Sequence, residues 1–266
     1  MRLFSLLRVW LVALLASAAL LAGGRAAAQG GPAVAAASDL KFALDEIAAA
    51  FHKETGQPVR ISYGSSGNFL RQILQDAPFE LFLSADEGFV FELADRGRTL
   101  DRGVLYASGR IVLFSPRASS LQPDAQLAGL RAALADGRIS RFAIANPDHA
   151  PYGRAAREAL QAAGLWEALQ GRLVLGENVS QAAQFTLSGS AQGGIFAYAL
   201  ALTPAFANAG RYVLVPETMH RPLRQRMVLT RRAGPVAQAF FAYLQQPVAR
   251  SVFQRHGFAL PGAAPN

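Results

Sequence analysis

The sequence has no cysteine among its 266 residues, and only 17% of them are charged. The absence of cysteine excludes a disulfide-stabilised scaffold, a thiolate metal site, a cysteine nucleophile and a lipid on an N-terminal cysteine. Because 52% of the residues are hydrophobic, the low charge also excludes an intrinsically disordered chain. The length fits one large domain or two modest ones, and it is sufficient to bury a core without covalent staples.

The sequence also lacks the short motifs of common catalytic and nucleotide-binding sites. Its four histidines include no pair with the HExxH spacing of a zinc site. There is no GxSxG elbow, no Walker A loop and no GxGxxG motif after a strand. We therefore expect no enzyme, no catalytic residue, no cofactor and no metal coordinated directly by the protein. The sequence alone does not exclude a Ser–His–Asp triad assembled from distant positions.

The first 28 residues have the three-part organisation of a secretory signal peptide. Arg2 and Arg8 charge the start, 9–22 is an apolar run, and small residues stand at Ala26 and Ala28. This pattern predicts cleavage near Ala28. The alternative, a membrane anchor, would need about 20 apolar residues, and the run is shorter. We expect no membrane span after processing.

The positive charge is modest and spread along the chain. The formal net charge is +8, and the densest stretch runs from Arg221 to Arg232 with five arginines. This stretch is interpreted either as a solvated face or as a docking patch for an acidic partner. Secretion without cysteine fits a bacterial periplasm, where nucleic acid is not an expected partner. A bacterium with one membrane usually tethers such a protein through a lipidated cysteine.

Strands and helices alternate along most of the chain. Residues 33–96 predict three strand–helix pairs, and the first helix carries Leu40, Leu44 and Ile47 at helical spacing. Residues 104–115 then predict a long strand, after which the strand–helix alternation starts again. Repeated alternation of this kind is typical of parallel sheets with crossover helices.

The order of elements predicts an α/β protein with two lobes, each a mostly parallel sheet flanked by helices. The strand at 104–115 and a second at 225–230 would join the lobes as a two-strand hinge. We expect a signal peptide at 1–28, which precedes both lobes. The first lobe would comprise 29–110 and 229–266, and the second lobe 111–228.

Small or hydroxyl residues occupy four strand-to-helix junctions, at 37–39, 64–67, 151–153 and 177–180. In a parallel sheet such junctions share the carboxyl edge, which is where ligands bind in this architecture. Helix N-termini offer unpaired N–H groups and a positive dipole end, so the junctions are suited to a small anion. The alternative is that Ser38 and Ser66 are ordinary helix N-caps without any binding role.

Six blocks of sequence, four of them at these junctions, form a set with a characteristic order. They are 35–40 (AAASDL), 63–69 (YGSSGNF), 77–86 (APFELFLSAD), 144–153 (IANPDHAPYG), 176–179 (GENV) and 194–197 (GIFA). In order and spacing they resemble the signature blocks of periplasmic molybdate-binding proteins. The resemblance covers essentially the whole chain after the signal segment, and it is specific as a set although no single block would be.

The resemblance implies a type II periplasmic binding protein, the substrate-binding component of an ABC importer. Its two lobes would close on a tetrahedral oxyanion, molybdate or tungstate, and deliver it to a membrane permease. The protein would act as a monomer. The resemblance does not separate molybdate from tungstate, and the alternative is a binding protein for another small anion, such as sulfate, phosphate or an organic acid.

The resemblance also implies the ligand-binding residues, namely Ser38, Asp39, Ser66, Tyr152 and Val179. The two serines match hydroxyl-and-amide donors, and Val179 matches a backbone amide donor. We predict that Tyr152 supplies a phenol hydroxyl to the anion and that Tyr198 does not. Because a carboxylate beside the anion would repel it, we expect Asp39 to offer only its backbone N–H.

Overall fold

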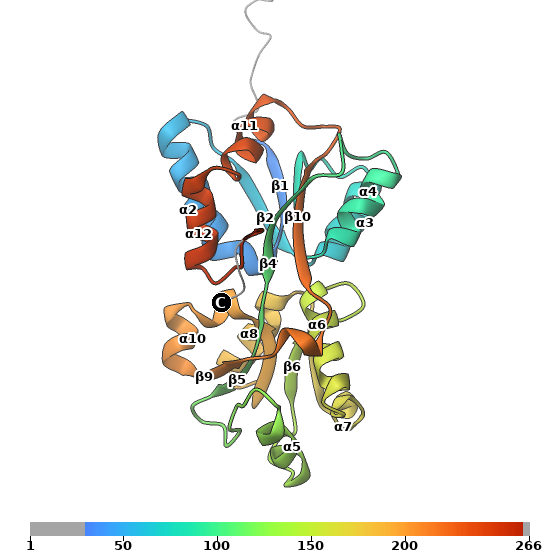
Figure 1. Cartoon of the computed structure of the whole chain (residues 1–266), viewed down its shortest axis with the longest axis vertical. Helices are drawn as coiled ribbons and strands as arrows, with labels where there is room; N and C mark the ends of the chain where they lie inside the picture. The colour runs from blue at the N-terminus through green and yellow to red at the C-terminus, as the bar shows by residue number, and fades with distance from the viewer. Residues whose placement is uncertain (1–29, 263–266) are drawn as a thin grey trace, which may run out of the picture. The chain divides into compact units, whose positions relative to one another are not determined.

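The computed structural model describes residues 30–262, and the predicted signal segment lies outside them. Two five-stranded sheets form the framework (Figure 1). The first contains β1 (Ala33–Ala37), β2 (Arg60–Gly64), β3 (Leu81–Ser84), β4 (Val104–Gly109) and β10 (Leu223–Leu229). The second contains β5 (Ile111–Pro116), β6 (Phe142–Ala145), β7 (Leu173–Gly176), β8 (Gly193–Ala197) and β9 (Gly210–Leu214).

The two sheets have the same arrangement of strand directions, and each defines one lobe. Their strand orders are β2-β1-β3-β10-β4 and β7-β6-β8-β5-β9. Three parallel strands come first in each order, and the fourth strand runs antiparallel to its neighbours. The predicted α/β fold with two mostly parallel lobes is confirmed.

Helices cover both lobes. Those of the first lobe are η1 (Ser38–Leu40), α2 (Lys41–Thr55), α3 (Ser66–Leu74), α4 (Glu87–Asp95), α11 (Pro235–Tyr243) and α12 (Pro247–Arg255). Those of the second lobe are α5 (Ala128–Ala135), α6 (Pro151–Ala162), α7 (Trp166–Leu169), η2 (Gln170–Arg172), α8 (Val179–Leu187), α9 (Tyr198–Ala201), α10 (Pro204–Ala209) and η3 (Glu217–Met219). In the first lobe, α2 and α12 lie on one side of the sheet and α3 and α4 on the other (Figure 1).

Apolar side chains at helical spacing anchor these helices. In α2, the predicted stripe of Leu44 and Ile47 is buried and continues to Phe51, whose ring centroid lies 5.0 Å from that of Phe240 on α11. Since buried aromatic pairs contribute beyond their area, this contact helps to hold α11 against α2. Among residues 30–262, no helix combines the length and apolar character needed to cross a bilayer.

The chain passes between the lobes at two places. The segment 104–115, predicted as one strand, is divided at Arg110, so that β4 belongs to the first sheet and β5 to the second. The second passage lies between β9 and β10. Leu223–Leu229 pairs with β3 and β4, so β10 belongs to the first sheet.

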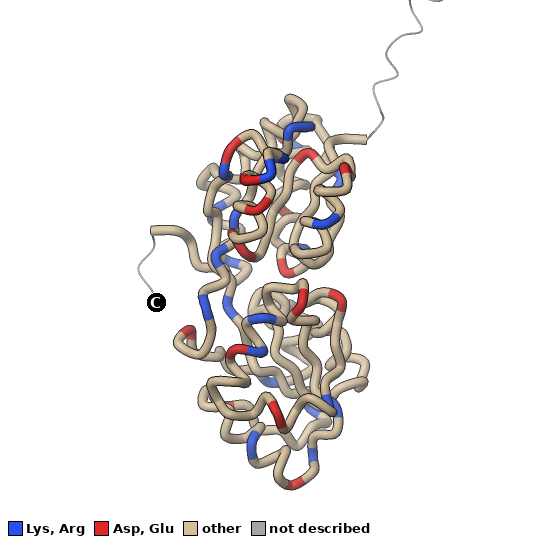
Figure 2. The backbone as a smooth tube through the Cα atoms, turned by 90° about the vertical axis from the view of Figure 1, so that its right-hand side faces the viewer, with Lys and Arg blue, Asp and Glu red and all other residues tan. Residues whose placement is uncertain are grey.

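The arginine-rich stretch makes contacts within the protein itself. Arg224 and Arg226 both pair with Glu87, Arg221 pairs with Glu158, and Arg232 lies near Asp76. Basic and acidic residues alternate over both lobes rather than gather in one patch (Figure 2). The stretch therefore resembles a paired, solvated face more than a free basic docking patch.

Candidate anion-binding site

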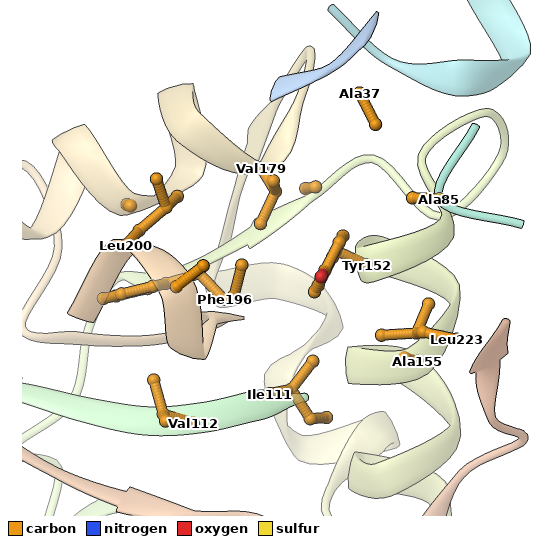
Figure 3. Packing of buried hydrophobic residues seen from close by; sticks show 14 of the residues in the cluster. Ala37, Ala85, Ile111, Val112, Tyr152, Ala155, Val179, Phe196, Leu200 and Leu223 are labelled. Carbon is orange, nitrogen blue, oxygen red and sulfur yellow. The ribbon is translucent and has the colours of Figure 1, made fainter. Parts of the chain in front are cut away.

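The five residues predicted as ligands line one small cavity between the lobes, with a volume of about 10 Å³. Ser38, Asp39, Ser66, Tyr152 and Val179 are each at least 97% buried. Ser38 and Asp39 follow β1 and Ser66 begins α3, whereas the other two lie at the starts of α6 and α8. Figure 3 shows Tyr152 and Val179 near Ala37 and Ala85 of the first lobe. The fold thus brings together residues that are more than 140 positions apart in the sequence.

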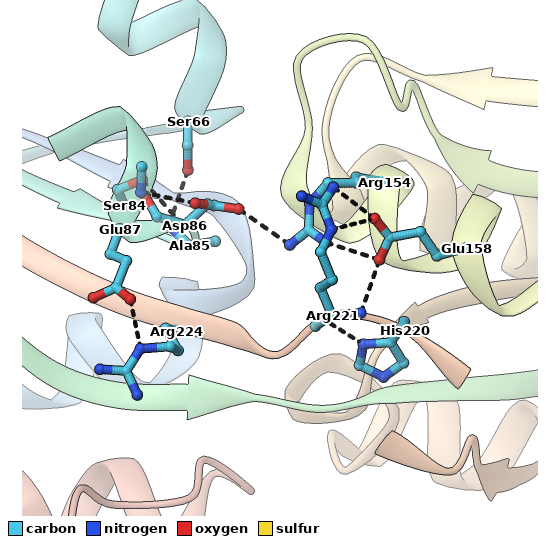
Figure 4. A network of polar contacts seen from close by, with 11 residues as sticks. Ser66, Ser84, Ala85, Asp86, Glu87, Arg154, Glu158, His220, Arg221 and Arg224 are labelled. Atoms are coloured by element: carbon cyan, nitrogen blue, oxygen red, sulfur yellow. Dashed lines mark hydrogen bonds and ion pairs between the residues drawn. The ribbon is translucent and has the colours of Figure 1, made fainter. Parts of the chain in front are cut away.

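The hydroxyl groups of Ser66 and Ser38 each accept a backbone hydrogen bond. The Ser66 hydroxyl accepts from the Ala85 N–H at 3.0 Å (Figure 4), and the Ser38 hydroxyl accepts from the Ser180 N–H at 3.2 Å. A hydroxyl whose lone pair is used in this way still has its own hydrogen to donate. Both serines are therefore arranged as donors at the cavity.

Neither serine caps its helix, contrary to the alternative interpretation. The N-cap of α3 is Ser65, whose hydroxyl accepts from the Asn68 N–H, and Ser66 is the first residue inside the helix. The short η1 helix begins at Ser38 without any side-chain cap. Since capping does not occupy their hydroxyls, both groups are available for another role.

Backbone N–H groups add to the donors. Ser66 and Val179 are the first residues of α3 and α8, and Tyr152 is the second residue of α6, after Pro151. Amides in the first turn have no acceptor within their own helix, and the positive end of the helix dipole lies there. Three helices therefore direct N–H groups and positive partial charge toward one cavity.

The Tyr152 hydroxyl has an acceptor other than the predicted one. It donates to Asp39 Oδ2 at 2.8 Å, and a phenol has a single hydrogen to give. In this arrangement the phenol positions Asp39, and the part of Tyr152 free to face an anion is its backbone N–H. Tyr198 lies elsewhere, with its ring under the Arg110 guanidinium at 4.8 Å and beside Tyr212.

The Asp39 side chain belongs to a buried polar network that the sequence interpretation missed. Gln225 Nε2 donates to Asp39 Oδ2 at 2.7 Å, and the Tyr106 hydroxyl donates to Gln225 Oε1 at 2.7 Å. Burial raises the pKa of the Asp39 carboxyl to about 6, against smaller lowering effects of Gln225, Tyr152 and its own N–H. One signal could have revealed Gln225, because it shares the buried face of β10 with Leu223 and Met227.

Direct contacts join the lobes around the cavity. The Gly67 N–H donates to the His149 carbonyl at 2.9 Å, and His149 Nδ1 lies 2.9 Å from the Ser65 hydroxyl. A methyl group on Gly67 would lie 2.6 Å from that carbonyl, so glycine is needed for this approach. In another contact between the lobes, Arg154 of α6 pairs with Asp86, the N-cap of α4, at 3.1 Å (Figure 4).

Comparisons with known proteins agree with this architecture. A family model described as bacterial extracellular solute-binding protein matches residues 32–259. The molybdate-binding protein ModA of Azotobacter vinelandii is 35% identical over 230 residues, which are 85% of this chain and 89% of that protein. ModA of Escherichia coli is 34% identical over 263 residues, covering 95% and 99% of the two chains. The solved structure of the A. vinelandii periplasmic molybdate-binding protein superposes with a TM-score of 0.79 at 33% identity, covering 86% of this chain and 99% of that one.

Proposed function

The chain belongs to the family of bacterial extracellular solute-binding proteins, and from this premise we propose that it captures molybdate or tungstate between its lobes. The observation that carries the proposal is the orientation of the Ser38 and Ser66 hydroxyls, which leaves both as donors to the cavity. The curated relatives support the choice of ligand, since two that cover most of the chain are molybdate-binding proteins.

The proposed ligand and the donors are chemically complementary. Molybdate near pH 7 is a dianion whose oxygens only accept hydrogen bonds. Two hydroxyls and the N–H groups of Ser66, Tyr152 and Val179 would supply five donors. Hydrogen bonds to a charged group contribute about 1.5–3 kcal/mol each, which offsets the costs of association and closure and leaves roughly nanomolar affinity.

The lining of the cavity also bears on other ligands. Within the described residues, neither arginine nor lysine lines it, whereas an organic carboxylate is usually held by a bidentate arginine. Sulfate has the same charge and shape as molybdate, so we propose that the larger anion is selected by the size of the cavity. Sulfate, phosphate and organic acids are the alternatives that the experiment below separates.

We further propose that the protein is a monomeric periplasmic carrier for the membrane permease of an ABC importer and has no catalytic activity. Closure around the anion would bury the ligand and create the combined surface of both lobes that a permease recognises. The predicted signal peptide and the periplasmic relative support this location. The five predicted residues, with Asp39 acting in the way described in the next subsection, form the proposed binding site.

The test is a thermal-shift titration of the processed protein with molybdate, tungstate, sulfate and phosphate. A ligand at about a thousand times its dissociation constant stabilises by roughly 4 kcal/mol, which raises the melting temperature by roughly 8–16 °C. We expect this rise with molybdate and tungstate alone. A comparable rise with sulfate would refute selection by size, and the absence of any rise would refute the proposed function.

A further inference from the structure

One oxygen of Asp39 is buried without a hydrogen-bond partner. Among the described residues, Asp39 Oδ1 and His220 Nε2 are the two buried side-chain atoms in this state. The other carboxyl oxygen, Oδ2, receives hydrogen bonds from both Tyr152 and Gln225. Asp39 is 99% buried and lines the cavity proposed to hold the anion. A buried polar atom without a partner is costly, so this oxygen needs a chemical explanation.

The groups around Asp39 supply no positive charge. The side chains that face it are Tyr106 from β4, Tyr152 from α6 and Gln225 from β10, all of them neutral. No arginine, lysine or histidine forms an ion pair with Asp39 anywhere in residues 30–262. An unpaired carboxylate would therefore face a bound dianion directly, and both burial and like charge disfavour that state.

Protonation of Oδ1 removes both difficulties. A neutral carboxylic acid has one O–H donor, and its remaining oxygen still accepts the two bonds from Tyr152 and Gln225. These two donors fix the carbonyl oxygen as Oδ2, which leaves the proton on Oδ1. The unpartnered oxygen then becomes a sixth donor to the anion.

We propose that Asp39 binds the oxyanion as a neutral carboxylic acid through Oδ1–H, so that each bound dianion is accompanied by one proton. The inference rests on the proposed function. In the overall step, the Asp39 carboxylate, one proton from solvent and one dianion form the complex, and no covalent bond to the anion is made. The oxyanion contacts the protein through its oxygens, and no residue coordinates the metal atom.

The pH dependence follows from the direction of the shift. Burial raises the pKa of Asp39 to about 6, and a dianion nearby raises it further. Below the pKa of the free protein, Asp39 is already protonated and the affinity is constant. Above it, every binding event takes up a proton, and the affinity falls about tenfold per pH unit. Burial raises the pKa of Tyr106 and of Tyr152 well above the ordinary value, so neither phenol titrates in this range.

The experiment is isothermal titration of the full processed protein with sodium molybdate at pH 7.5 in buffers of different ionisation enthalpy. We expect close to one proton taken up per molybdate, and about tenfold weaker binding at pH 8.5 than at pH 7.5. Asp39→Asn supplies an amide N–H of similar shape that donates without taking up a proton. Molybdate binding to this variant should therefore take up no proton, and its affinity should not change with pH. Asp136→Asn is the matched control, because Asp136 is exposed and pairs with Arg138, and it should behave as wild type.

The outcomes separate this inference from the proposed function. If wild-type protein binds molybdate without proton uptake, and its affinity does not change between pH 6.5 and 8.5, the inference is overturned and the proposed function is left intact. Proton uptake that persists in Asp39→Asn also overturns it, since the proton would then reside elsewhere. Wild-type protein that binds no molybdate at any pH overturns the proposed function and the inference together. The wild-type titration decides the matter even where Asp39→Asn fails to fold.

Discussion

Replacement of Ser66 by alanine removes one donor from the cavity and tests the proposed site most directly. The Ser66 side chain is fully buried, and its hydroxyl accepts from the Ala85 N–H at 3.0 Å. Loss of a hydrogen bond to a charged ligand costs about 1.5–3 kcal/mol, which corresponds to an affinity about 10- to 150-fold weaker. Ser66→Ala should therefore raise the dissociation constant for molybdate by that factor.

The same substitution should also lower stability without ligand, for a separate reason. The Ala85 N–H loses its acceptor, and an unsatisfied buried donor costs about 1–3 kcal/mol. For a protein of this size that lowers the melting temperature by roughly 2–12 °C. Because both Ser66 and Ala85 belong to the first lobe, this loss is present with and without ligand and does not enter the affinity.

Two assays on two variants keep these effects apart. Dissociation constants come from calorimetric titration, and stabilities come from thermal unfolding without ligand. Ser115→Ala is the matched control, since Ser115 is also fully buried and donates to the Leu121 carbonyl at 2.8 Å, away from the cavity. The control should lose stability and retain its affinity. A folded Ser66→Ala protein that binds molybdate as tightly as wild type would refute the assignment of Ser66 as a donor.

Three further substitutions probe closure and the Asp39 network. Arg154→Ala breaks the ion pair with Asp86 across the lobes and should speed molybdate dissociation about fivefold in stopped flow, whereas an unchanged rate would show that the pair does not hold the lobes together. A methyl group in Gly109→Ala would overlap the Tyr152 hydroxyl, so calorimetry should show at least about tenfold weaker binding, and wild-type affinity would contradict the packing described. Tyr152→Phe removes the hydrogen bond that positions Asp39 and should weaken molybdate binding, whereas Tyr198→Phe should not. Weaker binding in Tyr198→Phe alone would mean that the two tyrosines exchange roles.

The fold was predictable because its signals are local and periodic. Apolar spacing predicted α2 with Leu44 and Ile47 inward, and alternation of strands and helices predicted parallel sheets. Parallel strands end at one edge, so the positions of Ser38 and Ser66 beside the cavity followed from chain order. The sequence interpretation treated 104–115 as one strand, although it set a lobe boundary at 110/111, and the structure has two strands on either side of Arg110.

The side-chain network of the site depended on contacts that no local pattern encodes. Tyr152 and Asp39 are separated by 113 positions and Gln225 and Asp39 by 186. The sequence interpretation treated the Asp39 carboxylate as a repulsive group to be turned away from the anion, and it gave the phenol of Tyr152 to the ligand. The structure pairs these two groups with each other because the lobes bring both into the same water-poor space, where each needs a partner.

The two serines differ in what orients them, and this difference links binding to closure. The Ser66 hydroxyl is oriented by Ala85 of its own lobe, so its hydrogen is directed at the cavity whether or not the lobes meet. The Ser38 hydroxyl is oriented by the N–H of Ser180, which belongs to the other lobe, and Ser180 also donates to the Ser38 carbonyl at 2.9 Å. Approach of the second lobe therefore adds the amides of Tyr152 and Val179 and at the same time sets the Ser38 donor. A ligand that makes these contacts only in the closed arrangement favours that arrangement by the whole of their free energy. The measured affinity therefore includes the free energy of closure as well as that of the contacts.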